Sequence, residues 1–426
     1  MDNILDIKYE KHTLDNGLEV VLYQDKSLPI VSVNLWYKVG SANETNGKTG
    51  FAHLFEHMMF QGSKNVPKEK HFKFIEEAGG NLNGSTSFDK TNYYETLPSN
   101  SLELALWLES DRMGFLLEAL TQEKLDNQKD VVMNERRQRY DNQPYGLSWE
   151  LIFSNLFPDN HPYHWPTIGW MKDIEKFELN DVIDFFKTYY SPNNASLVIG
   201  GDIEYSSALQ LVKKYFDEIP KGKPIPKISV PKVELTENKK ITHQDNVQLS
   251  KLYLTWETAK LYDVDDATLD ILSDILTGSK NGRLFKTLVF EKQIAQDISS
   301  FQYSANLTGM FIIVATAKPG VTLDELKVEI ENVLSEIIND GISDKEFNRS
   351  LYTVKSSFIY SLQNLSSITN QINSYNLNLG EPNSFVHDLE RFQKLAPTSI
   401  KKVANKYLTK NYIELHIVPK ENSNAD

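Results

Sequence analysis

The chain has 426 residues, of which 40% are hydrophobic and 24% are charged, and it contains no cysteine. This length exceeds one ordinary hydrophobic core and predicts about two or three domains, while the missing cysteines exclude disulfides, thiolate metal ligands and a cysteine nucleophile. The net charge of -13 argues against a nucleic-acid partner or an anionic membrane surface, since both need a basic face on the protein.

The first residues read MDNILDIKYEKH, and acidic side chains interrupt every apolar run in this stretch. As it stands, the stretch matches neither a signal peptide nor a transit peptide. Nothing in the sequence approaches the length and hydrophobicity of a membrane span. We therefore expect a cytoplasmic protein, or a periplasmic one if a signal peptide has been removed.

The N-terminal half begins with strand patterns and continues with helices. Residues 11–39 predict neighbouring antiparallel strands, because apolar positions alternate after a turn at Asp15-Asn16-Gly17 and alternate again from residue 30 onward. A helix is then expected over residues 49–62. A second helix is expected over residues 68–77, ended by the pair Gly79-Gly80.

A strand-rich stretch, LNGSTSFDKTNYYETL, follows at residues 82–97. Two long helices are expected next, over residues 102–120 and 121–142. In the first of them, Glu109 and Asp111 are expected on the polar side that faces water.

A proline-rich stretch separates the two halves of the chain. The segment from Ile219 to Lys240 carries four prolines and almost no periodicity, which is typical of a linker. We place an N-terminal domain at residues 1–220, a linker at 221–236 and a C-terminal domain at 237–426.

The C-terminal half echoes the order of elements in the first half. A strand is expected over residues 249–257 and a helix over 265–276, followed by a glycine-containing turn, a helix and the strand FIIVATA. The sequence therefore predicts an α+β protein of two related domains, each a mainly antiparallel sheet packed with helices.

The decapeptide FAHLFEHMMF, at residues 51–60, places three ionisable side chains in an apolar helix. His53 and His57 lie one turn apart on the same face, and Glu56 shares that face. Burying an unpaired carboxylate costs several kcal/mol, so this stripe needs compensation. A divalent cation would supply this compensating charge, and two imidazoles suit Zn²⁺.

The spacing His-x-x-Glu-His is the inverzincin signature, the reverse of the more common zinc motif. Zinc then requires a third protein ligand, a carboxylate or a histidine from another helix. For a match of five residues alone, the competing interpretation is a polar cluster that is satisfied without any metal.

Further motifs make the chain resemble a known family. In order, they are HLFEHMMFQGS, EEAGGNLNGSTSFDKTNYYETLP, DVVMNERRQRYDNQPYG, HPYHWPTIGWMKDI and FFKTYYSPNNASLVIGGDI. This series resembles the pitrilysin (insulinase-type) family of zinc metallopeptidases, most of all its branch of two-domain processing peptidases. The resemblance covers residues 10–203 closely and the second half more weakly.

The resemblance implies the remaining parts of a zinc site. Glu135 matches the family's third ligand, with one Zn²⁺ bound per chain, and an earlier family glutamate corresponds to Gln128, which is a departure. We expect Gln128 to hydrogen-bond a ligand histidine less strongly than a carboxylate does. Glu56 is the expected general base of peptide hydrolysis. Without the resemblance, the preferred interpretation of Glu135 is a solvated acid on a charged helix.

The segment GGNLNGST matches the family's edge strand, which pairs with an extended peptide substrate. Asn81, Asn83, Gly84 and Ser85 are therefore the candidate substrate-binding residues, with Gly84 at a position where the family usually has alanine. An ordinary turn-rich hairpin is the alternative, because glycine, asparagine and serine are all turn formers.

The second half lacks a pair of residues that catalytic members of the family have. Where those members carry an arginine and, seven residues later, a tyrosine, this chain has Val289 and Gln296. The resemblance therefore implies the metal-bearing subunit of a heterodimer whose partner supplies the Arg/Tyr pair, acting on short or unfolded peptides. Two alternatives stay open: a homodimeric peptidase with Tyr303 or Arg283 as a substitute, and a non-catalytic structural or peptide-holding subunit.

Overall fold

The structure is a computed structural model that describes residues 5–420, so the expectation for the N-terminal leader falls partly on residues 1–4, outside this range. Within the described residues the chain forms two compact α+β units. The first holds residues 5–136, 165–229 and 359–387, and the second holds 137–164, 230–358 and 388–420. No described helix has the length and hydropathy needed to cross a membrane.

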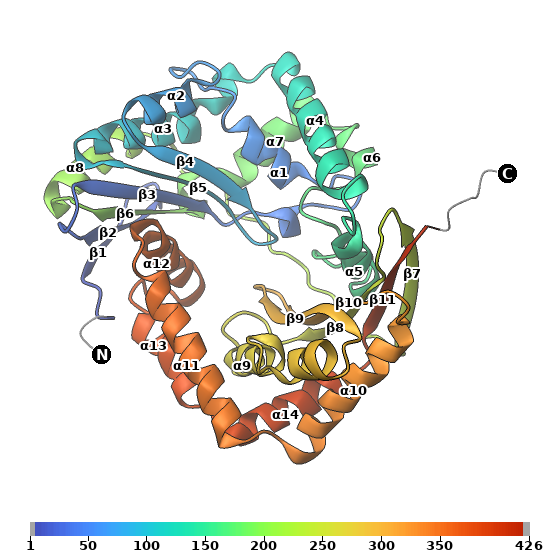
Figure 1. The fold of residues 1–426 in the computed structure, drawn as a ribbon. Helices are drawn as coiled ribbons and strands as arrows, with labels where there is room; N and C mark the ends of the chain where they lie inside the picture. The colour runs from blue at the N-terminus through green and yellow to red at the C-terminus, as the bar shows by residue number, and fades with distance from the viewer. Residues whose placement is uncertain (1–4, 421–426) are drawn as a thin grey trace. The chain divides into compact units, whose positions relative to one another are not determined.

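The first unit is built on a six-stranded sheet (Figure 1). Its order is β1-β2-β6-β3-β5-β4, with bounds β1 (Tyr9–Thr13), β2 (Glu19–Gln24), β3 (Ile30–Tyr37), β4 (Asn81–Thr86), β5 (Thr91–Pro98) and β6 (Ala195–Gly201). The expected hairpin turn joins β1 to β2. The expectation that β2 and β3 are neighbours is wrong, because β6 lies between them, parallel to β2 and antiparallel to β3.

Helices cover both faces of this sheet (Figure 1). They are α1 (Phe51–Met58), α2 (Lys70–Glu77), α3 (Leu102–Phe115), α4 (Gln122–Arg136), α6 (Met171–Ile174), α7 (Leu179–Tyr189), α8 (Tyr205–Phe216) and α12 (Leu365–Leu379). The expected helices over 49–62, 68–77, 102–120 and 121–142 are confirmed as α1 to α4, each shorter than its pattern.

Helix α12 comes from late in the chain and packs against β6 and β3. Its contacts with the sheet include polar ones: the Thr369 and Ser32 hydroxyls lie 3.0 Å apart, and Asn373 Nδ2 donates to Asn34 O at 2.8 Å. Burying these polar groups without partners costs free energy, so helix and sheet satisfy each other.

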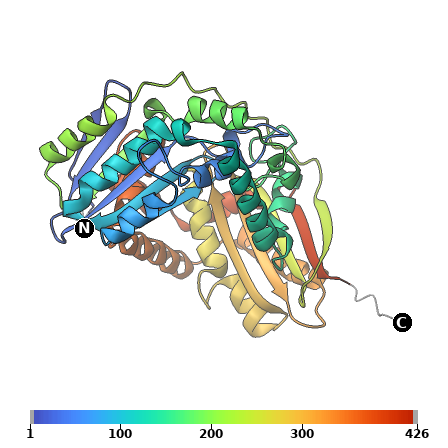
Figure 2. The ribbon, with the colours of Figure 1, turned by 90° about the horizontal axis from the view of Figure 1, so that it is seen from above.

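The second unit is built on a five-stranded sheet of order β7-β11-β8-β10-β9. Its strands are β7 (Lys239–Asp245), β8 (Lys251–Thr258), β9 (Ala295–Ser304), β10 (Gly309–Ala317) and β11 (Ile413–Pro419). Its helices are α5 (Ser148–Leu156), α9 (Asp266–Thr277), α10 (Leu323–Asp340) and α14 (Pro397–Leu408), while α11 (Asp344–Ser361) and α13 (Phe385–Gln393) contribute residues to both units. Figure 2 shows α9, in yellow, lying along β9.

The two sheets share one topology. In each, the last strand inserts between the first long strand and the next, parallel to the former and antiparallel to the latter: β6 between β2 and β3, and β11 between β7 and β8. This confirms the expectation of two related α+β halves.

The compact units differ from the domain boundaries expected from the sequence. Residues 137–164 belong to the second unit and residues 359–387 belong to the first. Each half of the chain therefore contributes one segment to the unit that is otherwise built from the other half. No helix or strand interrupts residues 219–238, in agreement with an extended connection there. The linker at 221–236 remains a prediction.

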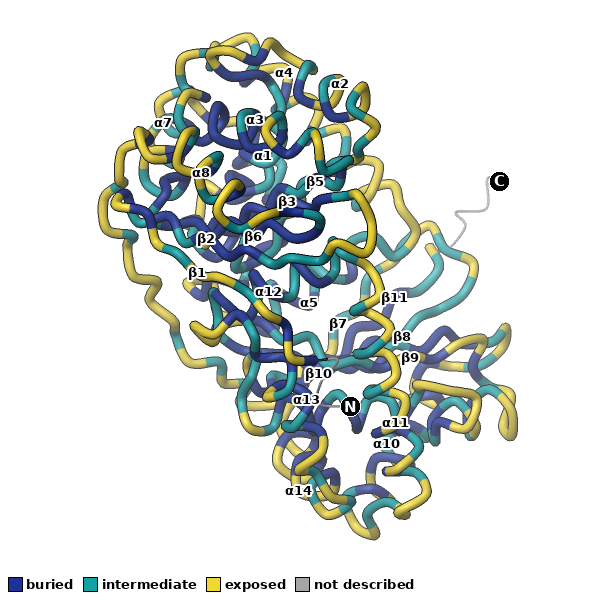
Figure 3. Tube along the Cα trace, turned by 90° about the vertical axis from the view of Figure 1, so that its left-hand side faces the viewer, coloured by how far each residue is buried: buried dark blue, intermediate teal, exposed yellow. Residues whose placement is uncertain are grey.

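Buried residues are concentrated on the central strands (Figure 3). Seven of the eight residues of β3 and all seven of β6 are buried, so both faces of these strands are covered, including the polar Ser32 and Asn34 that alternate with apolar residues in β3.

Helix α3 contradicts the expectation of a polar side, because Glu109 and Asp111 are both buried. The Glu109 carboxylate forms an ion pair with buried Arg112, three residues later, whose Nε donates to Glu109 Oε2 at 2.9 Å. Asp111 accepts from the backbone and side chain of Asn65, at 3.1 and 2.6 Å. Partners therefore compensate for the burial of both carboxylates.

A third buried acid, Glu95 on β5, faces the same cluster. Burial, followed by the negative charge of Glu109, raises its pKa well above the ordinary value, although Arg112 opposes this shift. Its unfolded pKa is about 4.3. Glu95 therefore binds its proton more tightly in the folded state, and its contribution to stability is complete below the unfolded pKa and is lost as pH rises toward the folded pKa.

We expect Glu95→Gln, which mimics the protonated side chain, to become increasingly more stable than the parent chain as pH rises from 5 to 9. The difference in unfolding free energy grows by at most about 1.4 kcal/mol per pH unit. Chemical denaturation across this pH range measures it, with exposed Glu218→Gln as the control. A difference that stays constant with pH would contradict the assignment.

Candidate metal centre

Helix α1 is buried over most of its surface, with one half-buried stripe. Its apolar side chains are packed: the Phe51 ring stacks on Phe177 with centroids 3.8 Å apart, and Phe55 lies 4.2 Å from the ring of Tyr190. The side chains of His53 and His57 are 14% and 24% exposed, so the imidazoles stay accessible on an otherwise fixed helix.

A buried carboxylate caps the first turn of α1. Glu44 Oε2 accepts from the Gly50 amide at 2.9 Å, and Glu44 Oε1 accepts from the Ala52 amide at 2.8 Å. A carboxylate at the N-terminal end of a helix interacts favourably with the helix dipole, and its oxygens accept from amides that have no partner within the helix. Burial raises the pKa of Glu44 to about 8, although the two amides oppose this shift.

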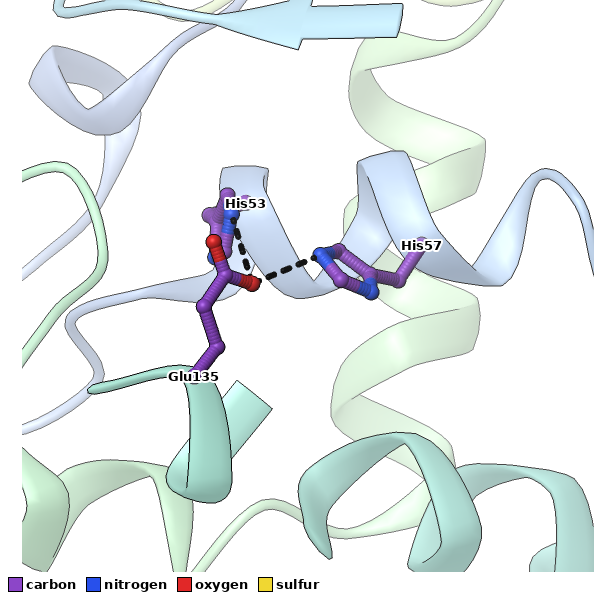
Figure 4. Close-up of side chains that lie close together, drawn as sticks. All are labelled: His53, His57 and Glu135. Carbon is purple, nitrogen blue, oxygen red and sulfur yellow. Dashed lines mark ion pairs between the residues drawn. The ribbon is translucent and has the colours of Figure 1, made fainter. Parts of the chain in front are cut away.

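The structure brings Glu135, in the last turn of α4, to the two imidazoles of α1 (Figure 4). Glu135 Oε2 lies 3.3 Å from His57 Nε2 and 3.7 Å from His53 Nε2. One ligand atom from each of the three residues lies within 4.8 Å of the other two. The three side chains converge on one point although they come from two separate helices.

This donor set fits a zinc ion. Zinc takes imidazole nitrogen and carboxylate oxygen at about 2.0–2.2 Å in a tetrahedral shell, which sets neighbouring ligand atoms about 3.3–3.6 Å apart. The nitrogen–oxygen distance of 3.3 Å to His57 lies at the lower edge of this range, and the distance of 3.7 Å to His53 lies just above it. Three protein ligands leave one position open, as in catalytic rather than structural zinc sites.

Glu56 points from the same helix toward strand β4. The Thr86 hydroxyl donates to Glu56 Oε2 at 2.6 Å. At position 84, a Cβ atom would lie 3.1 Å from Glu56 Cγ and 3.3 Å from Glu56 Oε1. Glycine at this position therefore leaves room for the Glu56 side chain. The family that this chain resembles usually has alanine here.

Gln128 is buried on α4, two turns before Glu135 on the same side of the helix. Its Nε2 donates to Asn127 Oδ1 at 2.9 Å, and within residues 5–420 no hydrogen bond joins it to His53 or His57. An influence of Gln128 on the imidazoles therefore stays a prediction.

The candidate substrate-binding residues lie on β4, which is an edge strand of the first sheet. Asn81, Asn83 and Ser85 are exposed, whereas Gly84 is half-buried on the face toward Glu56. Two of these positions already have partners: Asn83 Oδ1 accepts from the Gly84 amide at 2.9 Å, and Ser85 Oγ donates to Asn92 Oδ1 at 2.5 Å.

Val289 and Gln296 lie in the second unit. Val289 is half-buried in a short helical turn, and Gln296 is exposed near the start of β9. Arg283, considered above as a substitute clamp, is tied within the unit: its Nε donates to Glu346 Oε1 at 2.6 Å and its Nη2 donates to Gly341 O at 3.2 Å. The guanidinium hydrogen bond lowers the pKa of Glu346 to about 2.

Sequence reasoning did not single out Glu44 and Thr86, the two residues that hold α1 and Glu56 in place. The local pattern gave no signal for Glu44, because it lies six positions before the N-cap residue Gly50, outside the cap position and the first turn where acids mark the start of a helix. No local signal existed for Thr86, because its contact with Glu56 joins residues 30 positions apart.

Comparisons with known proteins extend over both units. A model of the insulinase family (peptidase family M16) matches residues 19–161, and a model of the peptidase M16 inactive domain matches residues 176–352. The chain is 31% identical to the zinc protease PqqE of Helicobacter pylori over 405 residues, which cover 94% of this chain and 90% of that protein.

Two further likenesses cover most of the chain. A probable mitochondrial-processing peptidase subunit beta of Arabidopsis thaliana is 24% identical, over 93% of this chain and 75% of that one. The crystal structure of a protease from Helicobacter pylori matches with a TM-score of 0.91 and 29% identity, covering 97% of this chain and 100% of that chain.

Proposed function

Because the chain belongs to the insulinase (peptidase M16) family, we propose that it is a zinc-dependent endopeptidase subunit that hydrolyses short or unfolded peptides. The observation that carries the proposal is the convergence of His53, His57 and Glu135 beside a fourth ionisable group, Glu56. Relatives named zinc proteases support it.

In this proposal the two imidazoles and the Glu135 carboxylate hold one Zn²⁺ per chain. When bound, zinc lowers the pKa of a coordinated water to about 7 and polarises a carbonyl group. Because the ligands sit on two packed helices, α1 and α4, the site is formed before substrate arrives.

Glu56 is the proposed general base. Its carboxylate takes a proton from the water that attacks the peptide carbonyl and passes that proton to the leaving amine nitrogen. The Thr86 hydroxyl, which donates to Glu56 Oε2, orients the carboxylate for this proton transfer.

The free edge of β4 is the proposed substrate-binding element. An extended peptide adds to such an edge through backbone hydrogen bonds. Binding of this kind selects for the extended shape of the peptide more than for its side chains. The exposed faces of Asn81, Asn83 and Ser85 line this edge. The Gly84 amide must leave the Asn83 side chain if it is to pair with a substrate.

The test of this function is metal content together with peptide cleavage. About one zinc per purified chain, removed by chelators together with any hydrolysis of an unstructured fluorogenic peptide, supports the proposal. A chain that folds but contains no zinc, and gains none on titration, contradicts it.

We expect the isolated chain to bind zinc but to cleave peptides weakly, because Val289 and Gln296 offer no arginine or phenol to stabilise the oxyanion. Loss of one such donor typically costs about 10²–10³ in rate. The similarity to a protein named as a subunit beta supports a heterodimer with a related chain that carries the Arg/Tyr pair.

Steady-state cleavage by the chain alone, and after addition of the related chain from the same host, measures this expectation. A mixture of the partner with Glu56→Gln chain is the control, since it keeps assembly and removes the proposed base. Fast cleavage by the chain alone would overturn the heterodimer and favour a homodimer with a substitute clamp.

A non-catalytic, peptide-holding subunit is the second candidate. The match of residues 176–352 to a domain described as inactive favours it. The donor set beside Glu56 weighs against it, since a scaffold has no physical need for a base next to a metal site. Such a subunit would hold a peptide in the presence of any added partner without turning it over.

A further inference from the structure

We infer that the segment Trp165–Asp173, here called the brace, holds α1 and α4 at the spacing that brings Glu135 to the two imidazoles. Gly169 and Arg136 are its positioning residues. The inference rests on the proposed zinc site and deepens it, because it explains how ligands from two helices come to share one ion.

The brace touches α1 through two glycines packed back to back. Gly50, which precedes α1, and Gly169 have φ angles of 95° and 78°, a region that favours glycine. A Cβ on Gly169 would lie 2.4 Å from Gly50 Cα and 2.4 Å from Thr49 O, and a Cβ on Gly50 would lie 2.6 Å from Ile168 O. The contact is between backbones, so no side chain can move aside to relieve a larger residue.

Hydrogen bonds fix the brace to the same end of α1. Thr49 Oγ1 donates to Asp173 Oδ2 at 2.8 Å and accepts from the Trp170 amide at 2.9 Å. Trp165 Nε1 donates to Ser41 O at 3.0 Å. Thr49 and Asp173 are both buried, so these bonds are shielded from water.

The brace touches α4 through Arg136, the neighbour of Glu135. Arg136 is 5% exposed, and its Nη1 donates to Gly169 O at 2.8 Å. Its guanidinium carbon lies 5.9 Å from the centre of the Trp170 ring. Seven residues earlier on α4, Lys129 Nζ donates to Glu175 O and Phe177 O, just beyond the brace.

Gly169 therefore contacts both ends of the proposed coupling, the start of α1 and the end of α4. Its α-carbon fits against Gly50, three positions before His53, and its carbonyl holds the arginine next to Glu135. A displacement at this point changes the distance between the carboxylate and both imidazoles. Metal affinity depends steeply on ligand geometry, and loss of a supporting hydrogen bond typically costs about 10–100-fold.

The first experiment compares Gly169→Ala with Gly47→Ala. Both glycines have positive φ, 78° and 87°, but nothing lies within 4 Å of a Cβ built on Gly47. The two variants therefore share the conformational strain of alanine and differ only in the contact with α1. We expect Gly169→Ala to bind Zn²⁺ at least about tenfold more weakly than the parent, and Gly47→Ala to bind it normally.

The second experiment removes the hydrogen bond to α4. Arg136→Gln is expected to weaken Zn²⁺ binding about tenfold, whereas Arg136→Lys, which keeps a cationic donor, should retain most of the affinity. Competition with a chromophoric chelator measures the affinity. Thermal unfolding of each metal-free variant reports whether the fold itself is intact.

Hydrogen exchange of the metal-free proteins provides a readout that does not depend on zinc. If the brace couples the helices, Arg136→Gln speeds exchange in residues 48–55, which include the start of α1, as well as in 130–137 and 166–174. Faster exchange only around position 136, with parental zinc affinity in both Arg136→Gln and Gly169→Ala, would overturn the inference. A parent chain that binds no zinc would refute the proposed function, and the exchange data would still decide whether the brace couples α1 to α4.

Discussion

Replacing Glu56 by glutamine is expected to reduce peptide hydrolysis by about 10²–10⁴-fold while zinc content stays at one ion per chain. Glutamine keeps the size of the side chain and can still accept the Thr86 hydrogen bond that now reaches Glu56 Oε2 at 2.6 Å. It cannot accept and release a proton at neutral pH. The loss should appear in kcat more than in KM, because Glu56 acts on the attacking water and not on peptide binding.

The measurement is steady-state cleavage of an unstructured peptide, in the assembly that proves active, beside zinc analysis of the same samples. Glu123→Gln, an exposed position at the start of α4, is the control for a change from carboxylate to amide. Loss of zinc from the Glu56→Gln chain would assign Glu56 to the metal and not to proton transfer. Unchanged hydrolysis would remove it from the mechanism.

Glu135→Gln should abolish tight zinc binding. The substitution removes the only anionic ligand of the set and leaves an amide 3.3 to 3.7 Å from the two imidazole nitrogens. We expect affinity to fall by more than the about 10–100-fold that loss of an outer hydrogen bond typically costs. Hydrolysis should fall with it, because no activated water remains.

Added zinc stabilises a protein that binds it by an amount that grows with the ratio of free zinc to Kd. Zinc should therefore raise the Tm of the parent chain and of Glu56→Gln, and leave the Tm of Glu135→Gln almost unchanged. Parental zinc affinity in Glu135→Gln would show that the ion, if present, is held by other residues.

The sequence alone predicted the parts of the candidate site that are local. His53, Glu56 and His57 lie within five positions on one helix, so their shared face follows from helix geometry. Glu135 was expected only because the chain resembles a known family. Nothing in the charged stretch around it distinguishes a ligand from a solvated acid, and only the packing of α4 on α1 brings it to the imidazoles.

Long-range packing also explains the expectations that were wrong. The alternation of apolar and polar residues identified β2 and β3 correctly as strands. It carries no information on whether a later strand, here β6, inserts between them. Glu109 and Asp111 were expected on the polar side of their helix, because surface helices separate polar and apolar faces. Their partners, Arg112 and Asn65, make burial possible, and one of the two comes from a distant loop.

The late origin of α12 affects how the protein is made. The ribosome releases the chain from its N-terminus, and segments that pair over long sequence separations fold slowly. The face of the first sheet that bears Ser32 and Asn34 has its hydrogen-bond partners only after Thr369 and Asn373 have been synthesised. The unit that holds the candidate metal centre therefore folds completely only after nearly all of the chain has been made, and a gene fragment that stops at residue 220 should give a product that aggregates.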